Sequence, residues 1–323
     1  MGSGRASARA PATIANVGPG FDVFCLAVRG PSDTVAIREA EEDALRVEGP
    51  DASSISSRFR ENTAGIVVNA LRRASGIDTP LEVVVTKGIP AGRGLGSSAA
   101  SCAAAALAFL KLYPQSRRLG AAGFLEAAVE GEAAVSGRHF DNLAGALLGG
   151  FVTIASTDPI VLSRQPVSSR IRIAIAVPEL VLRTEDMRRV LPDTVPLRDA
   201  VSNVGKAATL ALALTRGDAD LAGRCLEDRL AEPRRVPFVT GYAEARSAAL
   251  AAGAAGFALA GSGSTVFALA ASDAAAERSA KAMQDAFRRR GINANAFTTS
   301  VDNSIPMGPI LGRRGARFSL VTE

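Results

Sequence analysis

The sequence is poor in the side chains that build metal and redox sites. Its 323 residues include one histidine, His139, and three cysteines, Cys25, Cys102 and Cys225. Without a Cys-x-x-Cys pair or a second histidine, the usual ligand sets of a zinc site cannot be assembled. Three widely spaced cysteines in apolar stretches also indicate a reducing compartment rather than a disulfide framework.

Aromatic and lysine side chains are scarce as well. Tryptophan is absent, aromatic residues make up 5% of the chain, and lysine occurs only at Lys87, Lys111, Lys206 and Lys281. The net charge of +5 comes mostly from scattered arginines. Because stacking platforms and a continuous basic patch are both missing, we predict no nucleic-acid partner.

Long apolar runs are missing too. No stretch reaches the roughly 20 uninterrupted apolar residues that a membrane span needs. Residues 1–22 carry arginines but no apolar core of a secretory signal. We therefore predict no membrane partner and a cytoplasmic location. Hydrophobic residues at 47% and charged residues at 21% are typical of a globular protein.

The order of strand and helix patterns divides the chain into two mixed halves. A glycine or proline ends most of the helical stretches, and alternating apolar residues mark the strands. Residues 157–170 mix proline, serine and charge, which favours a linker or a hairpin. We predict an α+β fold with domains 1–160 and 161–323. The expected strands are 33–40, 44–49, 80–90, 150–156, 170–178, 256–270 (two strands) and 293–300; the expected helices are 61–76, 97–113, 119–137, 202–218, 221–235, 242–254 and 274–291.

The stretch PAGRGLGSSAAS, residues 90–101, places three glycines before an alanine-rich segment that strongly favours a helix. A Walker A loop is excluded because the stretch contains no lysine. A dinucleotide fingerprint, GxGxxG, would need its third glycine where Ser97 stands and an acidic residue about 20 positions later, and neither is present. A plain strand-to-helix turn with serine caps remains an alternative. The order of strand, glycine loop, serines and helix favours a phosphate cradle, in which backbone N–H groups face a polyphosphate.

The same stretch resembles the nucleotide-binding motif of the GHMP kinases. Two further blocks resemble family motifs: PATIANVGPGFDVF near the N-terminus, and LAGSGSTVFAL near the C-terminus, where Ser264 replaces the usual proline. The resemblance extends over residues 10 to 317. It implies an N-terminal domain like ribosomal protein S5, a ferredoxin-like C-terminal domain, and ATP with Mg²⁺ as cofactors. The residues matched to nucleotide binding are Pro90, Gly92, Arg93, Gly94, Leu95, Gly96, Ser97, Ser98 and Ala99.

Two stretches are similar to the homoserine kinase branch of this family. These are NVGPGFDVF, residues 16–24, and SGRHFDNLAGALLGG, residues 136–150, which is one residue shorter than the branch pattern. The resemblance implies ATP-dependent phosphorylation of the homoserine side-chain hydroxyl, a step of threonine biosynthesis. The expected partners are thus homoserine and ATP, and the oligomeric state stays open, a homodimer included.

Homoserine is a zwitterion, so its binding site needs groups of both signs. By resemblance, Arg188 and Arg235 would hold its carboxylate, with the neighbours Arg189 and Arg234 as rival assignments. The same resemblance gives its ammonium group to Asp22, helped by Asn16 and with Gly261 nearby. For each arginine the alternative is a solvated surface charge.

Three adjacent positions are candidates for catalysis. His139 is expected to orient the substrate, with Asp141 and Asn142 beside it. Asn142 stands where related sugar and mevalonate kinases have a catalytic aspartate. Since an amide is no useful proton acceptor, the resemblance implies catalysis by positioning, without a dedicated base.

Magnesium prefers hard oxygen ligands. Ser98 and Glu132 resemble the metal-binding pair of the family, and Glu130 is the rival carboxylate on another side of the same helix. Asn62, with Glu61 before it, resembles the adenine-side contact. Two other functions stay open: another GHMP small-molecule kinase of mevalonate or shikimate type, or a decarboxylase relative; and a nucleotide-binding regulator without activity.

Overall fold

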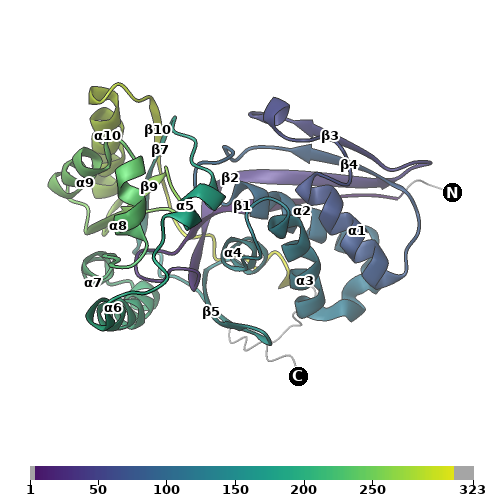
Figure 1. The fold of residues 1–323 in the computed structure, drawn as a ribbon, viewed down its shortest axis with the longest axis horizontal. Helices are drawn as coiled ribbons and strands as arrows, with labels where there is room; N and C mark the ends of the chain where they lie inside the picture. Colours follow the sequence, from purple (N-terminus) through teal and green to yellow (C-terminus); the bar gives the residue numbers. More distant parts are fainter. Residues whose placement is uncertain (1–3, 309–323) are drawn as a thin grey trace.

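The computed structural model describes residues 4–308, which form two halves, each built on its own sheet (Figure 1). The sheet of the first half has the strand order β3-β4-β2-β5-β6, and β1 pairs with β2. Its pairs are antiparallel except for the parallel pair β3–β4. The strands are β1 (Arg5–Ala15), β2 (Phe24–Glu39), β3 (Ala44–Glu48), β4 (Leu81–Thr86), β5 (Phe151–Thr157) and β6 (Ile160–Gln165).

Four helices cover one face of this sheet (Figure 1). They are α1 (Thr63–Ser75), α2 (Ser97–Leu112), α3 (Gly120–Ala133) and α4 (Asp141–Leu148). Helix α2 is buried on almost every side, because its alanines let it lie closely against β1 and β2 and against α1, α3 and α4. A helix that is apolar all round belongs in a core, and α2 fixes the position of the loop that precedes it.

The second half is a four-stranded antiparallel sheet in the order β10-β7-β9-β8. This order, with helices between the strands, is the ferredoxin-like arrangement, so the expected mixed two-domain fold is confirmed. Its elements are β7 (Arg172–Pro178), α5 (Thr184–Arg189), α6 (Leu197–Arg216), α7 (Ala219–Arg224), α8 (Glu232–Arg235), α9 (Tyr242–Ala251), β8 (Gly256–Leu259), β9 (Val266–Ala270), α10 (Asp273–Arg289) and β10 (Ala294–Thr299).

Both faces of the second sheet are covered, and the alternating sequence of β7 shows how. Ile173 and Ile175 belong to a core shared with α6, α7 and the first half. Ala174 and Ala176 face the other way, into a smaller core with α9 and α10. Successive side chains of a strand point to opposite faces, so one strand serves two layers.

Several parts of the sequence-based assignment differ from the structure: helices α4 and α5 were not expected, and β2 begins well before the strand expected over 33–40. Strand β1 was not expected, since its run of alanines is interrupted by Arg9 and Pro11. The helix expected over 221–235 is broken between α7 and α8. There the buried Asp228 side chain accepts hydrogen bonds from the backbone N–H groups of Leu230, Ala231 and Glu232, which turns the chain.

The first sheet continues past the predicted boundary at residue 160. Strand β6 pairs with β5 in an antiparallel hairpin, so the change of sheet falls between β6 and β7. After β10 the chain returns to the first half, where Asp302 donates to the carbonyl of Ala27 and Met307 donates to that of Leu147. The two halves are thus built from segments that interleave at the C-terminal end.

Among residues 4–308, no helix combines the length and the apolar character that crossing a membrane requires.

Candidate active site

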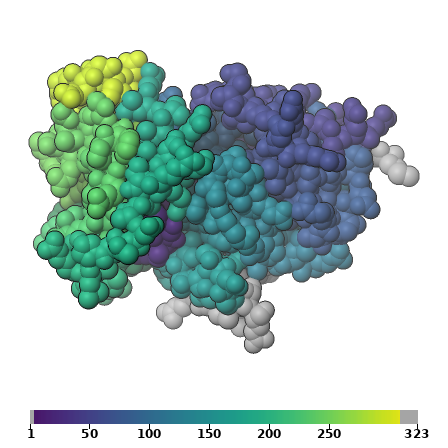
Figure 2. Space-filling model, viewed as in Figure 1, coloured from purple at the N-terminus to yellow at the C-terminus, as the bar shows by residue number. Residues whose placement is uncertain are grey.

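A cavity of about 530 Å³ opens between the two halves. In Figure 2 these halves lie side by side, the first purple to blue-green and the second green to yellow. Almost every residue matched to function at the sequence level lines this cavity: Asn16, Asp22, Asn62, Gly92, Arg93, Gly94, Gly96, Ser97, Ser98, Glu132, His139, Asp141, Asn142, Arg188, Arg235 and Gly261. Pro90, Leu95 and Ala99 do not line it, and Leu95 and Ala99 are buried in the core.

The three glycines of the 90–101 stretch all have left-handed backbone conformations, with φ of 65° at Gly92, 83° at Gly94 and 67° at Gly96. Two of them are also closely surrounded by protein. A Cβ at Gly94 would lie 2.4 Å from the carbonyl oxygen of Ala260, and one at Gly96 would lie 2.0 Å from Oγ1 of Thr13. The glycines are therefore required by contacts with the other two motif segments as well as by the turn itself.

The loop ends at the N-terminus of α2, a helix of 16 residues. Gly96 is its N-cap and supplies no side chain to accept from the first N–H groups. The positive end of the helix dipole faces the cavity next to Ser97 and Ser98. Helix starts of this kind bind phosphate groups.

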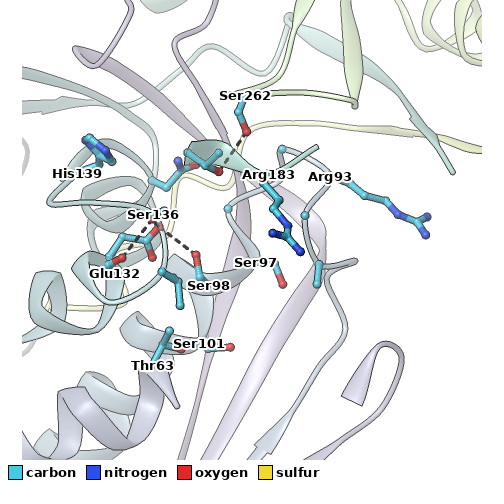
Figure 3. A pocket seen from close by; sticks show the side chains of 18 of the residues that line it. Thr63, Arg93, Ser97, Ser98, Ser101, Glu132, Ser136, His139, Arg183 and Ser262 are labelled. Atoms are coloured by element: carbon cyan, nitrogen blue, oxygen red, sulfur yellow. Dashed lines mark hydrogen bonds between the residues drawn. The ribbon is translucent and has the colours of Figure 1, made fainter. Parts of the chain in front are cut away.

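A buried carboxylate stands beside this helix start (Figure 3). Oε1 of Glu132 accepts hydrogen bonds from Ser98 Oγ at 3.0 Å and from Ser136 Oγ at 2.5 Å. Its Oε2 is buried and has no hydrogen-bond partner among residues 4–308, and burial raises the pKa of this carboxyl group. The rival Glu130 points away from the cavity and binds Arg73 at 2.7 Å.

A buried ion pair that the sequence reasoning missed lies under the same loop. The ammonium group of Lys87 binds the carboxylate of Asp33 and donates to Ser101 Oγ at 2.8 Å and to the carbonyl of Ser97 at 3.0 Å. Asp33 also accepts from the backbone N–H groups of Gly88 and Ile89. The pair ties the end of β4 to the first turn of α2. The one available signal was a lysine between a strand and the glycine loop.

In the same cavity, Arg188 and Asp22 form a bidentate ion pair. Nη1 and Nη2 of Arg188 lie 2.9 and 2.6 Å from the two carboxylate oxygens. Asn16 holds the loop that carries Asp22: its Oδ1 accepts from the Asp22 N–H at 3.1 Å, and its Nδ2 donates to the carbonyl of Gly261. Asn16 and Asp22 both have positive φ, a strained conformation of the kind that gathers at functional sites.

Arg235 lies next to this pair and is almost fully buried. Its Nε donates to the carbonyl of Met187 and its Nη1 to that of Gly261 at 3.0 Å, while Nη2 makes no hydrogen bond within the described residues. Both guanidinium groups lie near the ring of Phe21, with Cζ of Arg188 5.4 Å and Cζ of Arg235 5.2 Å from the ring centre. The rival arginines behave as surface charges: Arg189 pairs with acidic residues of its own helix, and Arg234 is exposed.

The same cavity is also lined by the three candidate catalytic residues, His139, Asp141 and Asn142. Burial, with Asp22 acting in the same direction, raises the pKa of Asp141 to about 6. Burial and then the charge of Arg188 lower the pKa of His139, which keeps its imidazole neutral at pH 7. Asn142 Oδ1 accepts from Thr13 Oγ1 at 2.8 Å, so Thr13 fixes the amide and is a further residue that the sequence reasoning missed.

Asn62 and Glu61, the residues expected to contact adenine, already form hydrogen bonds or ion pairs within the protein. Asn62 caps α1, with Oδ1 accepting from the N–H of Ala64 and Nδ2 donating to the carbonyl of Ser56. Glu61 is exposed and binds Arg58. Both residues line the cavity, together with Ile55 from the segment before α1.

Comparison with known proteins decides the family. The model described as GHMP kinases N terminal domain matches residues 62–150, and GHMP kinases C terminal matches residues 210–289. The chain belongs to the GHMP kinases. A homoserine kinase of Halorubrum lacusprofundi is 40% identical over 294 residues, covering 91% of this chain and 96% of that protein. A homoserine kinase of Thermococcus gammatolerans is 41% identical over 293 residues, covering 90% and 96%.

A solved GHMP kinase structure agrees with this assignment. The homoserine kinase from Cytophaga hutchinsonii has 34% sequence identity and a TM-score of 0.87, over 93% of this chain and 96% of that one. Mevalonate diphosphate decarboxylase from Staphylococcus aureus shares the fold at 13% identity with a TM-score of 0.65. Within the GHMP kinases, the chain therefore belongs with the homoserine kinases. The family uses ATP as its phosphoryl donor.

Proposed function

We propose that this GHMP kinase transfers the terminal phosphoryl group of ATP to the side-chain hydroxyl of homoserine, a step of threonine biosynthesis carried out in the cytoplasm. The observation that carries this proposal is the Asp22–Arg188 ion pair, which lines the same cavity as the phosphate loop. The homoserine kinases that match at 40% identity point to the same acceptor.

The ion pair suits a zwitterionic amino acid. An acceptor that enters between the two residues can offer its ammonium group to Asp22 and its carboxylate to Arg188, so each charge keeps a partner. Arg235 adds a free Nη2 beside the carboxylate position. An uncharged sugar would have to separate the pair without replacing either partner, which costs binding energy. The geometry therefore selects against neutral acceptors.

The part of the cavity around the glycine loop suits ATP. The N-terminus of α2 and the glycine loop can receive its phosphates, and Lys87, paired with Asp33, holds the first turn of α2 in place. The residues also fit Mg²⁺: the orphaned Oε2 of Glu132 and the hydroxyl of Ser98 are hard oxygen ligands facing the nucleotide position. When bound there, the ion would neutralise charge on the transferring phosphates.

The proton of the acceptor hydroxyl has no dedicated receiver among the described residues of this site, and it passes to the transferring phosphoryl group or to water late in the step. Asn142 is an amide held by Thr13, and His139 is neutral at pH 7 but lies beside Asp22 and Arg188, where we assign it to orienting the acceptor. The remaining contributions are positioning and charge stabilisation, which dominate catalysis when the transition state of phosphoryl transfer is loose. Asp141 places a negative charge near the acceptor and supports the binding of its ammonium group.

An ADP-release assay with ATP, Mg²⁺ and one acceptor at a time tests the proposal. We expect turnover with homoserine and no stimulation by mevalonate, shikimate or galactose. Asp22→Asn should abolish the response to homoserine while a nucleotide analogue still binds. Equal rates with galactose would refute the acceptor assignment, and nucleotide binding without turnover on any acceptor would favour a regulator.

A further inference from the structure

Glu232 is an acidic residue near the candidate site to which neither the motifs nor the proposed reaction gives a role. It opens α8, the short helix that also carries Arg235 (Figure 1). Its carboxyl group accepts hydrogen bonds from the backbone N–H of Leu259 at 2.7 Å and from the hydroxyl of Tyr242. Burial raises the pKa of this carboxyl group to about 7. A carboxyl group that is withdrawn from water and bonded in this way needs an explanation.

Helix α8 has only four residues, Glu232–Arg235, and cannot hold its own position. A helix of about one turn is unstable without outside contacts, because nucleation costs more than its few hydrogen bonds return. Its start is fixed by Asp228, whose carboxylate accepts from the N–H groups of Leu230, Ala231 and Glu232. The placement of the rest of the turn, which ends at Arg235, depends on contacts of its side chains.

Glu232 and Arg235 stand three positions apart, so their side chains leave the same side of α8. Both reach one short segment of the third motif. Glu232 accepts from the N–H of Leu259, and Nη1 of Arg235 donates to the carbonyl of Gly261 at 3.0 Å. This segment is anchored to the first half, where the N–H of Gly261 donates to the carbonyl of Ala15. The bond from Leu259 to Glu232 therefore fixes α8 against a segment that is already in place.

Arg235 needs this support because no charged partner holds it. Arg188 pairs with Asp22, whereas Arg235 forms no ion pair among residues 4–308 and is almost fully buried. Burial and then the positive charge of Arg188 lower the pKa of Arg235, so both effects oppose a charged group at this place. Its guanidinium group stays there through bonds to the carbonyls of Met187 and Gly261, which require α8 to lie at the right distance.

We propose that Glu232 is a positioning residue for the acceptor: by holding α8 against Leu259, it directs the guanidinium group of Arg235 toward the carboxylate of homoserine. The inference rests on the proposed function, in which Arg235 contacts that carboxylate. Tyr242 completes the support from α9, because its hydroxyl donates to Glu232 and its ring packs against Phe257 of β8. Loss of Glu232 should weaken homoserine binding and leave the nucleotide part of the cavity unchanged.

Glu232→Met, which keeps the length of the side chain but removes both strong acceptors, tests the proposal. We expect the KM for homoserine to rise about tenfold or more. The dissociation constant for homoserine, measured by calorimetry with a non-hydrolysable ATP analogue bound, should rise equally, and that for the analogue should not change. Glu232→Gln should regain most of the loss, since its amide oxygen accepts from Leu259 and its NH₂ group donates to Tyr242. Glu244→Met, at an exposed glutamate of α9, is the matched control and should behave as wild type.

A double-mutant cycle with Arg235→Lys distinguishes positioning from general support of the fold. If Glu232 acts through Arg235, E232M should raise the homoserine KM far less in an R235K background than in the wild-type chain. Equal effects in both backgrounds, or a matching loss of nucleotide affinity, would overturn the proposal and make Glu232 a structural residue. An unchanged homoserine KM in R235K alone would refute the acceptor role of Arg235 under the proposed function, and this inference with it.

Thermal denaturation verifies that each variant folds. If E232M does not fold, Tyr242→Phe takes its place, because it removes only the hydroxyl that donates to Glu232 and keeps the ring against Phe257. The homoserine KM should then rise about three- to tenfold, as expected for the loss of one hydrogen bond. A wild-type homoserine KM in Tyr242→Phe would contradict the proposal.

Discussion

At the scale of single residues, the two carboxylates of α3 differ in the direction of their side chains. Glu132 points into the cavity beside Ser98, and Glu130 points to Arg73 on α1. We expect Glu132→Gln to lower kcat by about 10²-fold or more, because a neutral amide is a poor ligand for Mg²⁺ and stabilises less charge at the phosphates. Glu130→Gln, the matched control, should stay near wild type. The reverse ranking would show that Glu130 is the ligand.

Arg235 and its neighbour Arg234 form a similar matched pair, one buried and one exposed. Arg235→Lys keeps the charge but loses the planar fork that bonds Met187 and Gly261 and that we propose contacts the acceptor. A lost charge-assisted hydrogen bond is worth about 1.5–3 kcal/mol, so kcat/KM for homoserine should fall about 10- to 100-fold. The KM for ATP should change little, and Arg234→Lys should match wild type. Unchanged kinetics in Arg235→Lys would make it a structural residue.

The pH profile separates Asp141 from His139. The pKa of Asp141 is raised to about 6 by burial, so its carboxylate is neutralised as the pH falls through 6. We expect kcat/KM for homoserine to fall about tenfold per pH unit below that value, because the ammonium group loses a nearby negative charge. This decline should disappear in Asp141→Asn and persist in His139→Asn. If it disappears in His139→Asn instead, with a loss of ~10²–10⁴-fold, His139 is the base.

The raised pKa of Asp141 also predicts how the free energy of unfolding changes with pH. A folded-state pKa above the unfolded value of about 3.9 means that the folded protein holds the extra proton between pH 4 and 6. The stabilisation from protonated Asp141 is therefore complete below pH 4 and is lost as the pH rises through 6. Asp141→Asn should remove this slope from the free energy of unfolding, which urea titrations at each pH measure.

The sequence indicated most residues of the site but not the ones that hold them. Motif positions such as Asp22, Ser98 and Glu132 stand in recognisable patterns, and the structure brings them to one cavity, although their roles remain predictions. Thr13 and Lys87 were missed, because each acts through a contact with a segment distant in the chain, Asn142 for Thr13 and Asp33 for Lys87. Long-range pairing of this kind leaves little local signal, which for Lys87 was its place between a strand and the glycine loop.

At the scale of elements, hydrophobic periodicity and helix-ending residues predicted the bounds correctly where the local sequence alone determines the element. Helix α1 ends at Gly76 as expected, and α2 begins at Ser97 and stops before Pro114. The pattern failed for β1, whose alanines are weak strand formers held by pairing with β2 over most of their length. It also failed before α8, where a single side chain, Asp228, outweighs the helical propensity of its neighbours.

The glycine loop shows why element and site were predicted together. Its left-handed residues could be expected from the sequence, since glycine is the residue that adopts them freely. The identity of the neighbours at Gly94 and Gly96 could not, because they come from the third and first motif segments. The loop therefore joins the two halves of the protein as well as shaping the phosphate end of the cavity.

At the scale of the whole molecule, backbone hydrogen bonds join the halves both at the cavity and away from it. At the cavity, the N–H of Gly261 donates to the carbonyl of Ala15 and that of Thr265 to the carbonyl of Arg93. Away from it, the N–H of Arg29 donates to the carbonyl of Ser300 and that of Asp302 to the carbonyl of Ala27. The main hydrophobic core also runs from the first half into α6 and α7. The halves consequently share contacts that neither could keep alone.

From these shared contacts we expect the halves to unfold in one cooperative transition. In scanning calorimetry the calorimetric enthalpy should equal the van't Hoff enthalpy, which is the criterion for two-state unfolding. Homoserine together with a non-hydrolysable ATP analogue, each at about 100 times its dissociation constant, should raise the whole transition, since each ligand adds about 2.7 kcal/mol. Two resolved transitions, of which only one responds to the ligands, would show that the cavity belongs to one half and that the contacts between the halves are weak.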